Sequence, residues 1–247
     1  EINYLGSSKI YLMSERKLKS RKKLVILSGA GISAESGLGT FRDSDGLWEK
    51  YDINDVATID AWYKNKKLVL DFYNARRIQN IAAQPNLGHL ALVDLEDYFD
   101  VYIITQNIDD LHERAGSSNV THLHGEIMKG KSEHDEGLIF DLKHPEIQLG
   151  DKAADGHQMR PHVVWFGEAV PMMNKAEEIM VDADIVLVVG TSLNVYPAAN
   201  LIYSCPTDAV KYIIDPNDIP VNSEFTHLKG TATSILPKLK TILRFQE

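Results

Sequence analysis

Four short, predominantly apolar runs recur along the chain, separated by segments of helical periodicity. They occupy residues 23–27, 101–105, 184–189 and 211–214, and each is followed by a polar or glycine-containing turn. Runs of this length without polar alternation are typical of strands buried on both faces. Between them, residues 87–98 and 175–181 carry apolar side chains three and four positions apart, as amphipathic helices do. This alternation predicts an α/β fold with a doubly wound parallel sheet, whose ligand crevice lies at the carboxyl ends of the strands.

Two stretches interrupt the alternation. Residues 38–80 are mostly helical in pattern and contain no strand-like apolar run, whereas residues 126–160 are polar and rich in glycine-containing turns. With 247 residues, the chain is long enough for one large domain that carries a smaller module. We interpret the two stretches as insertions that meet to form this smaller module.

A glycine-rich loop directly follows the first predicted strand. Gly29, Gly31 and Ala34 fit the pattern G-x-G-x-x-G/A, in which glycines permit a tight turn and a close backbone approach to a pyrophosphate. Taken alone, the loop fits equally well a strand-to-helix turn that needs glycine only for its geometry. The acidic residue expected roughly 20 positions onward is not evident, because an insertion intervenes, so the arrangement differs from that of a standard dehydrogenase.

Two further segments carry reactive side chains. Gln106-Asn107-Ile108-Asp109 follows the second predicted strand, and Asn107 and Asp109 together can satisfy the donor and acceptor groups of an amide. His124 precedes Gly125 and can exchange a proton near neutral pH. A lone histidine beside a glycine is more often a capped or solvent-facing residue than a catalyst, so its interpretation depends on the rest of the sequence.

Charge and cysteine content exclude several classes of function. The chain has 26 Lys and Arg against 35 Asp and Glu, a formal net charge of −9, which disfavours a broad electrostatic grip on nucleic acid and favours a protein or metabolite partner. Its apolar runs are far shorter than the roughly 20 residues of a membrane-spanning helix, and no secretory signal pattern is found, so we expect no membrane partner and a cytoplasmic location. Cys205 is the single cysteine, which excludes an intrachain disulfide and a thiolate zinc site.

Six motifs in a fixed order make the chain resemble the sirtuin (Sir2) family of NAD-dependent protein deacylases. They are Gly29-Ala30-Gly31-Ile32-Ser33, Phe41-Arg42, Thr105-Gln106-Asn107-Ile108-Asp109, His124-Gly125, Pro161-His162-Val163-Val164-Trp165-Phe166-Gly167-Glu168 and Gly190-Thr191-Ser192-Leu193. The resemblance extends from about Leu24 to Leu236. It implies a Rossmann-type NAD-binding domain of residues 20–37, 81–125 and 161–247, and a small domain of residues 38–80 and 126–160. It also implies NAD as cosubstrate, an acylated-lysine protein or peptide in the cleft between the domains, and nicotinamide, free lysine and O-acyl-ADP-ribose as products.

The resemblance also implies roles for individual residues. His124 would be the general base that takes a proton from a ribose hydroxyl, and Asn107, also catalytic, would hold the nicotinamide carboxamide together with Asp109. The implied cofactor-binding residues are Gly29, Ala30, Gly31, Ser33, Phe41, Arg42, Gln106, Asn107, Ile108, Asp109, Gly190, Thr191, Ser192, Asp215, Thr231 and Ala232. The implied substrate-binding residues are Ala57, Tyr73, Arg76, Val163, Val164, Phe166, Gly167 and Glu168. Residues 163–168 resemble the strand along which the family pairs its peptide substrate, although an ordinary buried strand would have the same pattern.

Tyr73 and Arg76 indicate which acyl group is removed. They are three positions apart in a helical pattern, so both can face one ligand, and an Arg guanidinium suits a carboxylate. In the acidic-acyl branch of the family such a Tyr-x-x-Arg pair binds an acyl carboxylate, and Ala57 stands where that branch keeps a small residue. We therefore expect removal of succinyl, malonyl or glutaryl groups in preference to acetyl. A surface arginine beside a core tyrosine is the alternative.

The chain departs from the family between residues 126 and 160, where most members carry four zinc-binding cysteines and this chain has none. We interpret the acidic and histidine residues of this interval as polar surface, predict no metal site and no zinc, and expect packing and hydrogen bonds to hold the module. The histidines outside the motifs are interpreted as structural or surface residues; they are His122, His134, His144, His157 and His162.

Three alternatives to a deacylase stay open. An NAD glycohydrolase or protein ADP-ribosyltransferase would use the same cleft without acyl-lysine, and would release nicotinamide without an acylated peptide. A sensor of NAD or ADP-ribose would bind without turnover, which the combination of Asn107, Asp109 and His124 argues against. A dehydrogenase fits least, because no hydride-acceptor pocket is indicated.

Overall fold

The computed structural model describes residues 21–39, 50–221 and 223–244, and the larger part of the molecule is built around a six-stranded parallel sheet. The strand order is β3-β2-β1-β7-β8-β9, and every pairing is parallel. The strands are β1 (Lys23–Ser28), β2 (Asp100–Thr105), β3 (Val120–His122), β7 (Ile185–Val189), β8 (Val210–Asp215) and β9 (Phe225–Lys229). The four predicted runs are the four central strands, so the predicted α/β fold with a parallel sheet is confirmed. The two edge strands, β3 and β9, were not predicted.

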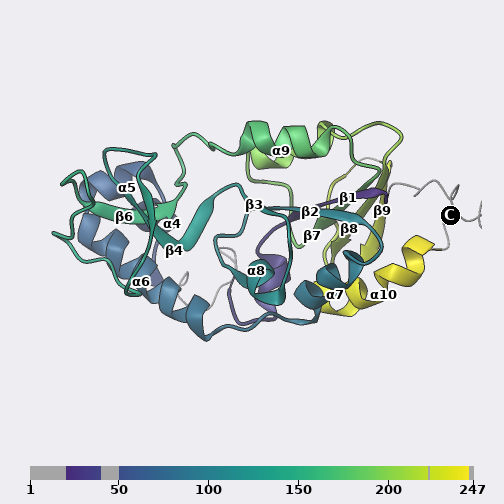
Figure 1. Cartoon of the computed structure of the whole chain (residues 1–247), viewed down its shortest axis with the longest axis horizontal. Helices are drawn as coiled ribbons and strands as arrows, with labels where there is room; N and C mark the ends of the chain where they lie inside the picture. Colours follow the sequence, from purple (N-terminus) through teal and green to yellow (C-terminus); the bar gives the residue numbers. More distant parts are fainter. Residues whose placement is uncertain (1–20, 40–49, 222, 245–247) are drawn as a thin grey trace, which may run out of the picture.

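Helices cover both faces of this sheet, as Figure 1 shows. Helices α7 (Leu87–Leu95) and α10 (Ala232–Arg244) pack against one face, and α9 (Met173–Met180) with the 3-10 helix η1 (Ala198–Tyr203) packs against the other. Alternate residues of β1 serve the two cores: Leu24 and Ile26 face α7 and α10, whereas Val25 and Leu27 face α9 and η1. The helix predicted over residues 87–98 ends at Leu95, where the chain turns.

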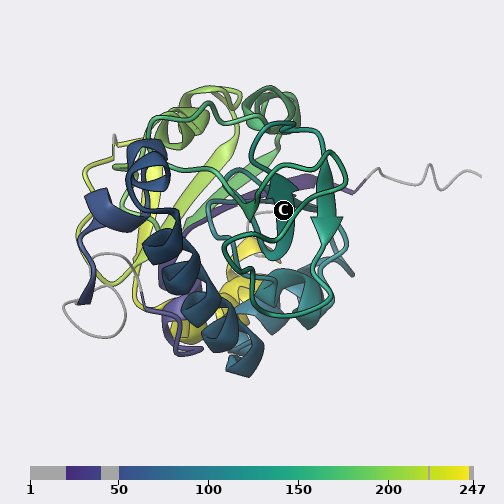
Figure 2. The ribbon, with the colours of Figure 1, turned by 90° about the vertical axis from the view of Figure 1, so that its left-hand side faces the viewer.

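The two interrupting stretches lie together at the other end of the molecule. The first contains helices α4 (Ile53–Val56), α5 (Ile59–Lys64) and α6 (Lys66–Ala82), in agreement with its helical pattern. The second forms an antiparallel sheet of order β5-β4-β6, with β4 (Gly125–Ser132), β5 (Ile139–Asp141) and β6 (Met159–Val163). The reading of residues 126–160 as polar and turn-rich therefore missed β4, β5 and the first two residues of β6. Figure 2 views the molecule from this end, with the blue helices of the first stretch beside the teal strands of the second.

One apolar core joins the two stretches. Trp62 and Phe72 of the first stretch pack in the same buried cluster as Ile127 and Ile147 of the second. Buried polar side chains reinforce the contact: Asn74 exchanges two hydrogen bonds of 3.0 Å with the backbone of Ile147. The stretches thus share a core, while the exact domain bounds of 38–80 and 126–160 stay a prediction.

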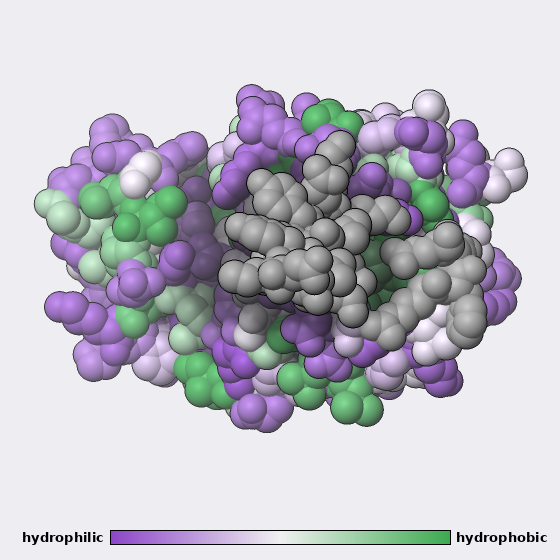
Figure 3. Space-filling view, turned by 45° about the vertical axis from the view of Figure 1, so that its right-hand side comes forward, coloured by the Kyte–Doolittle hydropathy of each residue, from purple (hydrophilic) through white to green (hydrophobic). Residues whose placement is uncertain are grey.

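The surface of the described residues is mainly hydrophilic on the face shown in Figure 3, where hydrophobic residues form separate small patches. Within residues 21–39, 50–221 and 223–244, no group of three or more His, Cys, Asp or Glu side chains is placed to hold a metal ion. No helix in the described part of the chain is long and apolar enough to cross a membrane.

Candidate active site

A cavity of about 720 Å³ opens at the carboxyl ends of β1, β2, β7 and β8 and reaches across to α6 and to residues 163–168. It lies where the strand order reverses between β1 and β7, which is where parallel α/β sheets bind ligands. The predicted crevice is therefore present, and residues from both parts of the molecule line it.

The glycine loop forms one wall of the cavity because it packs against the turn after β7. The amide N–H groups of Gly29 and Gly31 donate to the carbonyl oxygens of Val189 and Gly190, at 3.0 and 2.8 Å. A Cβ atom on Gly31 would lie 2.7 Å from the Cα atom of Gly190, closer than real contacts allow. Glycine at this position thus lets two backbone turns meet, and their peptide groups line the cavity without side chains in the way.

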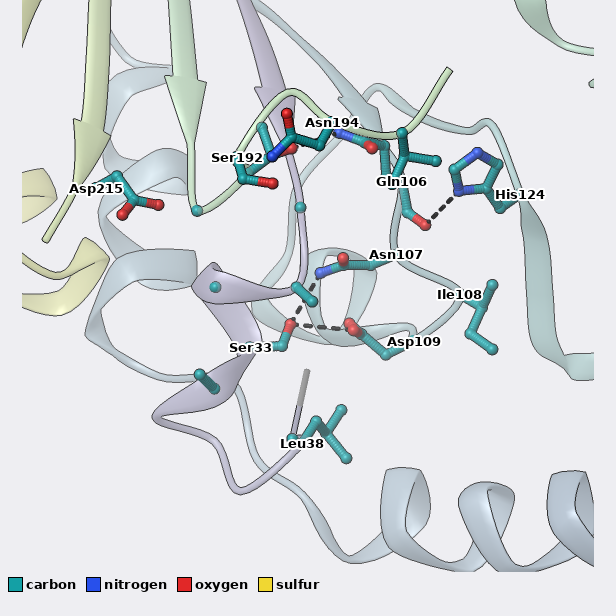
Figure 4. A pocket seen from close by; sticks show the side chains of 18 of the residues that line it. Ser33, Leu38, Gln106, Asn107, Ile108, Asp109, His124, Ser192, Asn194 and Asp215 are labelled. Carbon is teal, nitrogen blue, oxygen red and sulfur yellow. Dashed lines mark hydrogen bonds between the residues drawn. The ribbon is translucent and has the colours of Figure 1, made fainter. Parts of the chain in front are cut away.

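A polar cluster lies at the carboxyl end of β2, as Figure 4 shows. The Ser33 hydroxyl donates to Asp109 Oδ2 at 3.0 Å and accepts from Asn107 Nδ2 at 3.1 Å. All three residues are buried. Burial raises the pKa of Asp109, and the hydrogen bonds from the Leu111 amide and from Ser33 oppose this rise. An amide and a carboxylate are therefore held side by side in the cavity, where together they can bind a ligand carboxamide.

His124 projects beside Gln106 at the edge of this cluster (Figure 4). Its Nδ1 atom lies 2.9 Å from the carbonyl oxygen of Gln106. A carbonyl only accepts, so Nδ1 carries the proton and Nε2 keeps its lone pair. Burial lowers the pKa of His124, and the bond to Gln106 only partly offsets this. The ring is neutral at pH 7 and can accept a proton at Nε2.

Helix α6 contributes Tyr73 and Arg76 to the lining of the cavity, which also includes the small side chain of Ala57. Tyr73 is buried against Trp165, with ring centroids 6.1 Å apart. Burial raises the pKa of Tyr73, so its hydroxyl keeps its proton and can donate it. Burial lowers the pKa of Arg76, while the charges of Tyr73 and Asp109 act in the opposite direction.

Residues 163–168 lie along the cavity as a clamped turn. Strand β6 ends at Val163, so the interpretation of the whole run as a strand is wrong. The carboxylate of Glu168 accepts hydrogen bonds from the backbone amide of Trp165 and from both terminal nitrogens of Arg160. These bonds connect the end of the turn to its middle and to strand β6. The Phe166 amide donates to the Ala57 carbonyl at 3.0 Å, so Phe166 pairs with the segment before α5, and the residue as a whole is 48% exposed.

Every sequence-predicted site residue within the described part of the chain lines this one cavity. The residues so placed are Gly29, Ala30, Gly31, Ser33, Ala57, Tyr73, Arg76, Gln106, Asn107, Ile108, Asp109, His124, Val163, Val164, Phe166, Gly167, Glu168, Gly190, Thr191, Ser192, Asp215, Thr231 and Ala232. Phe41 and Arg42 lie outside the described residues. The cavity also has lining residues that were not predicted, among them Leu38, Asn194, Tyr196 and Asn217. Asn194 and Tyr196 lie one and three positions after the Gly190-Thr191-Ser192-Leu193 motif, and this proximity is the signal that could have indicated them.

Comparisons with known proteins agree with this arrangement. A family model described as the Sir2 family matches residues 29–197. A protein named NAD-dependent protein deacylase from Helicobacter pylori is 54% identical over 195 residues, which cover 79% of this chain and 85% of that protein. One of the same name from Bacteroides thetaiotaomicron is 49% identical over 229 residues, covering 90% of this chain and 98% of that protein.

Solved structures show the same fold. A Sir2 homologue in complex with NAD superposes with a TM-score of 0.82 at 33% identity, covering 100% of this chain and 97% of that chain. A Sir2 complex with a deacetylated p53 peptide and 3'-O-acetyl-ADP-ribose superposes with a TM-score of 0.77 at 30% identity, covering 91% and 94% of the two chains.

Proposed function

The chain belongs to the Sir2 family, and on that premise we propose that it is an NAD-dependent protein deacylase that removes acidic acyl groups from lysine. The observation that carries the proposal is the state of His124. Its Nδ1–H is committed to the Gln106 carbonyl, so the basic Nε2 is available in the cavity that also contains Asn107 and Asp109. The relatives named NAD-dependent protein deacylase support the same reaction.

The residues present fit a dinucleotide. The contact of Gly31 with Gly190 leaves bare backbone on the wall where a pyrophosphate would lie. The amide of Asn107 and the carboxylate of Asp109 supply both halves of a carboxamide-binding pair, and Ser33 fixes their relative position. As cosubstrate, NAD supplies the ribosyl carbon that receives the acyl oxygen and the nicotinamide that leaves.

The protein's own groups then have three tasks. Asn107 and Asp109 orient the leaving ring, so that the ribosyl carbon is presented to the acyl oxygen of the bound lysine. His124 takes a proton from a ribose hydroxyl at Nε2, which turns that hydroxyl into the nucleophile that attacks the acyl carbon. The clamped turn of residues 163–168 holds the acylated peptide at the mouth of the cavity. With water consumed, the products are nicotinamide, the free lysine and O-acyl-ADP-ribose.

The preference for an acidic acyl group rests on Tyr73 and Arg76. The Tyr73 hydroxyl keeps its proton, because burial raises its pKa, and the Arg76 guanidinium lies on the next turn of the same helix. Both can donate hydrogen bonds to a carboxylate at the end of an acyl chain, and a charge-assisted bond of this kind contributes about 1.5–3 kcal/mol. Ala57 leaves room for the longer chain. We therefore expect succinyl-, malonyl- or glutaryl-lysine to be removed faster than acetyl-lysine.

The test is to incubate the protein with NAD and matched acetyl-, malonyl- and succinyl-lysine peptides, and to measure nicotinamide and deacylated peptide by mass. In Arg76→Met, kcat/KM for the succinyl peptide should fall by about 10- to 100-fold, with deacetylation little changed, because only the acidic chain loses its partner. Lys67→Met on the exposed side of α6 is the control and should change neither activity. Equal losses for both peptides in Arg76→Met would refute the acyl preference.

The same assay separates a deacylase from its alternatives. His124→Ala should lose deacylation and still bind NAD, because the ring supplies a proton acceptor and no part of the glycine loop. Nicotinamide released at the same rate without any acylated peptide would indicate a glycohydrolase or an ADP-ribosyltransferase. NAD binding without nicotinamide release, whichever peptide is added, would indicate a sensor.

A further inference from the structure

His122 lies two residues before His124, at the end of strand β3, and makes the same kind of contact. Its Nδ1 atom is 2.8 Å from the carbonyl oxygen of Asn107, while His124 Nδ1 is 2.9 Å from the carbonyl oxygen of Gln106. The two rings therefore reach consecutive peptide groups of one segment. That segment carries the carboxamide-binding side chains.

The second nitrogen of His122 distinguishes the two rings. Its Nε2 atom lies 2.8 Å from Glu113 Oε1 on helix α8 (Leu111–Ala115). A carbonyl and a carboxylate both accept hydrogen bonds, so the two nitrogens are satisfied together only when both carry protons. The His122 side chain is 8% exposed and that of Glu113 is 42% exposed, so the pair is anchored inside the protein and opens to solvent on the helix side.

The surrounding charges favour the protonated ring. Burial lowers the pKa of His122, but the hydrogen bond and charge of Glu113, the Asn107 carbonyl and the charge of Glu126 on β4 outweigh it and raise the pKa overall. Burial acts to raise the pKa of Glu113, yet its bond to His122 and the charge of that ring leave it below its usual value. The raised pKa of His122 and the lowered pKa of Glu113 are therefore both those expected of an ion pair.

Three other titratable groups face His122. Burial lowers the pKa of His112 and of His162, and the charge on His122 lowers each of them further. The same charge favours the ionised form of Asp109, against the effect of burial. His122 is thus the histidine of this group whose surroundings favour the charged form, and that charge acts on the Asp109 carboxylate that faces the cavity.

We propose that His122 is a positioning residue for the carboxamide end of the cavity, holding the Asn107 backbone in place only while Glu113 keeps the ring doubly protonated. The proposal rests on the proposed function in one respect, the assignment of Asn107 and Asp109 to the nicotinamide group. When the ring loses a proton, the remaining proton stays on Nε2, because a hydrogen bond to the Glu113 carboxylate is charge-assisted and stronger than one to a neutral carbonyl, and the bond to Asn107 is lost. Affinity for NAD then falls as the pH rises through the raised pKa of His122.

The test uses two ligands that differ only at the nicotinamide end. Binding of NAD and of ADP-ribose is measured by calorimetry, without acylated peptide, from about pH 6 to about pH 9. The dissociation constant of NAD should rise about fivefold or more over this range, as expected for loss of a charge-assisted hydrogen bond, and that of ADP-ribose should change less than about twofold. Glu113→Gln should move the midpoint of the NAD transition to lower pH, because it removes the charge that raises the pKa.

Two amide substitutions separate positioning from folding. The side-chain nitrogen of His122→Asn falls near Nδ1 and can still donate to Asn107, but it does not ionise, so NAD binding should stay tight at every pH. The nitrogen of His122→Gln falls near Nε2 and reaches Glu113 instead, so NAD binding should be weak at every pH. Thermal melting of both variants is measured alongside; if either fails to fold, wild type and Glu113→Gln still decide the question through their midpoints.

The proposal is overturned if NAD and ADP-ribose show the same pH dependence in the wild type, or if His122→Gln binds NAD as the wild type does. Turnover of acylated peptide is measured in parallel. If the protein turns over acylated peptide but its NAD binding does not depend on pH, only the positioning role of His122 is rejected. If NAD binding depends on pH but no peptide is turned over, only the deacylase function is rejected. A protein that binds no NAD at all removes both.

Discussion

The ion pair between Arg160 and Glu168 should be the most costly single contact to break in the turn of residues 163–168. Its two N–O distances are 2.7 and 2.9 Å, and the side chains are 5% and 13% exposed. The Arg160 guanidinium also lies 3.5 Å from the ring centroid of Trp165. Glu168→Gln keeps the shape but removes the charge, and leaves a buried cation without its partner. Loss of one partner of a buried pair costs about 3–5 kcal/mol.

This cost converts into a measurable shift. For a chain of this size, 1 kcal/mol corresponds to about 2–4 °C, so the melting temperature should fall by about 6–20 °C. The matched control is Asp55→Asn, which breaks the exposed pair with Lys64, at 3.2 Å and with side chains 47% and 77% exposed. That pair should contribute less than about 1 kcal/mol. Thermal and urea unfolding of both variants give the comparison, and equal losses would refute the reasoning that burial makes the pair important.

The pH dependence of the same difference is a second check. Burial raises the pKa of Glu168, but the hydrogen bonds and charge of Arg160 outweigh it and leave the pKa below its usual value. A carboxylate with a lowered pKa stabilises the fold above its ordinary pKa, and this contribution disappears as the pH falls through the folded value. The gap between wild type and Glu168→Gln should therefore be full at neutral pH and shrink in acid. A gap that stays constant in acid would assign the loss to packing instead of charge.

Two further predictions concern stability. Ser132→Ala should lower the free energy of unfolding, measured in urea, by about 1–3 kcal/mol. The reason is that the buried Ser132 hydroxyl donates to Asp155 at 2.6 Å and accepts a hydrogen bond from the His134 amide at 3.0 Å. The control is Ser118→Ala at an exposed position, which should change the free energy of unfolding by less than about 0.5 kcal/mol. Burial lowers the pKa of His89 to about 4, so unfolding takes up a proton below the ordinary pKa of histidine, and stability should fall as the pH drops from about 6.5 toward 4. His89→Gln should remove about 2 kcal/mol of the loss measured between pH 7 and pH 5, and an unchanged loss would show that the ring is not the group that titrates.

The sequence predicted those strands whose burial leaves a clear pattern. Each central strand contains a run of apolar residues because helices cover both of its faces, and β7 is apolar and buried throughout. The edge strands β3 and β9 are short or partly exposed, so they lack such a run. Strand β4 was missed for a related reason: Lys129, Gly130 and Lys131 stand in it, and polar residues around a glycine are otherwise typical of a turn.

The sequence predicted those site residues whose motif directly follows a strand. It was less informative for residues whose hydrogen-bond partners are backbone atoms or distant side chains. The segment Gln106-Asn107-Ile108-Asp109 comes directly after β2, so its position at the crevice follows from the fold. His122 was grouped with structural or surface histidines because its partners are a carbonyl 15 residues away and a carboxylate 9 residues away, neither of which forms a motif with it. Glu168 lies in a motif, but its commitment to Arg160 depends on a turn that the sequence pattern represents as a strand.

The two neighbouring histidines show how one scaffold produces opposite acid–base behaviour. Burial lowers the pKa of both rings, and each donates one bond to a carbonyl of the same segment. His122 alone has a carboxylate within hydrogen-bond reach, so its pKa is raised while that of His124 is lowered. His124 must be neutral to accept a proton, and His122 must be charged to donate two hydrogen bonds. Both rings are in the required state only at a pH between their two pKa values. A plot of kcat/KM for NAD against pH should therefore have an acid limb set by His124 and an alkaline limb set by His122. Glu113→Gln should move the alkaline limb alone, and movement of both limbs would show that the rings titrate as one coupled unit.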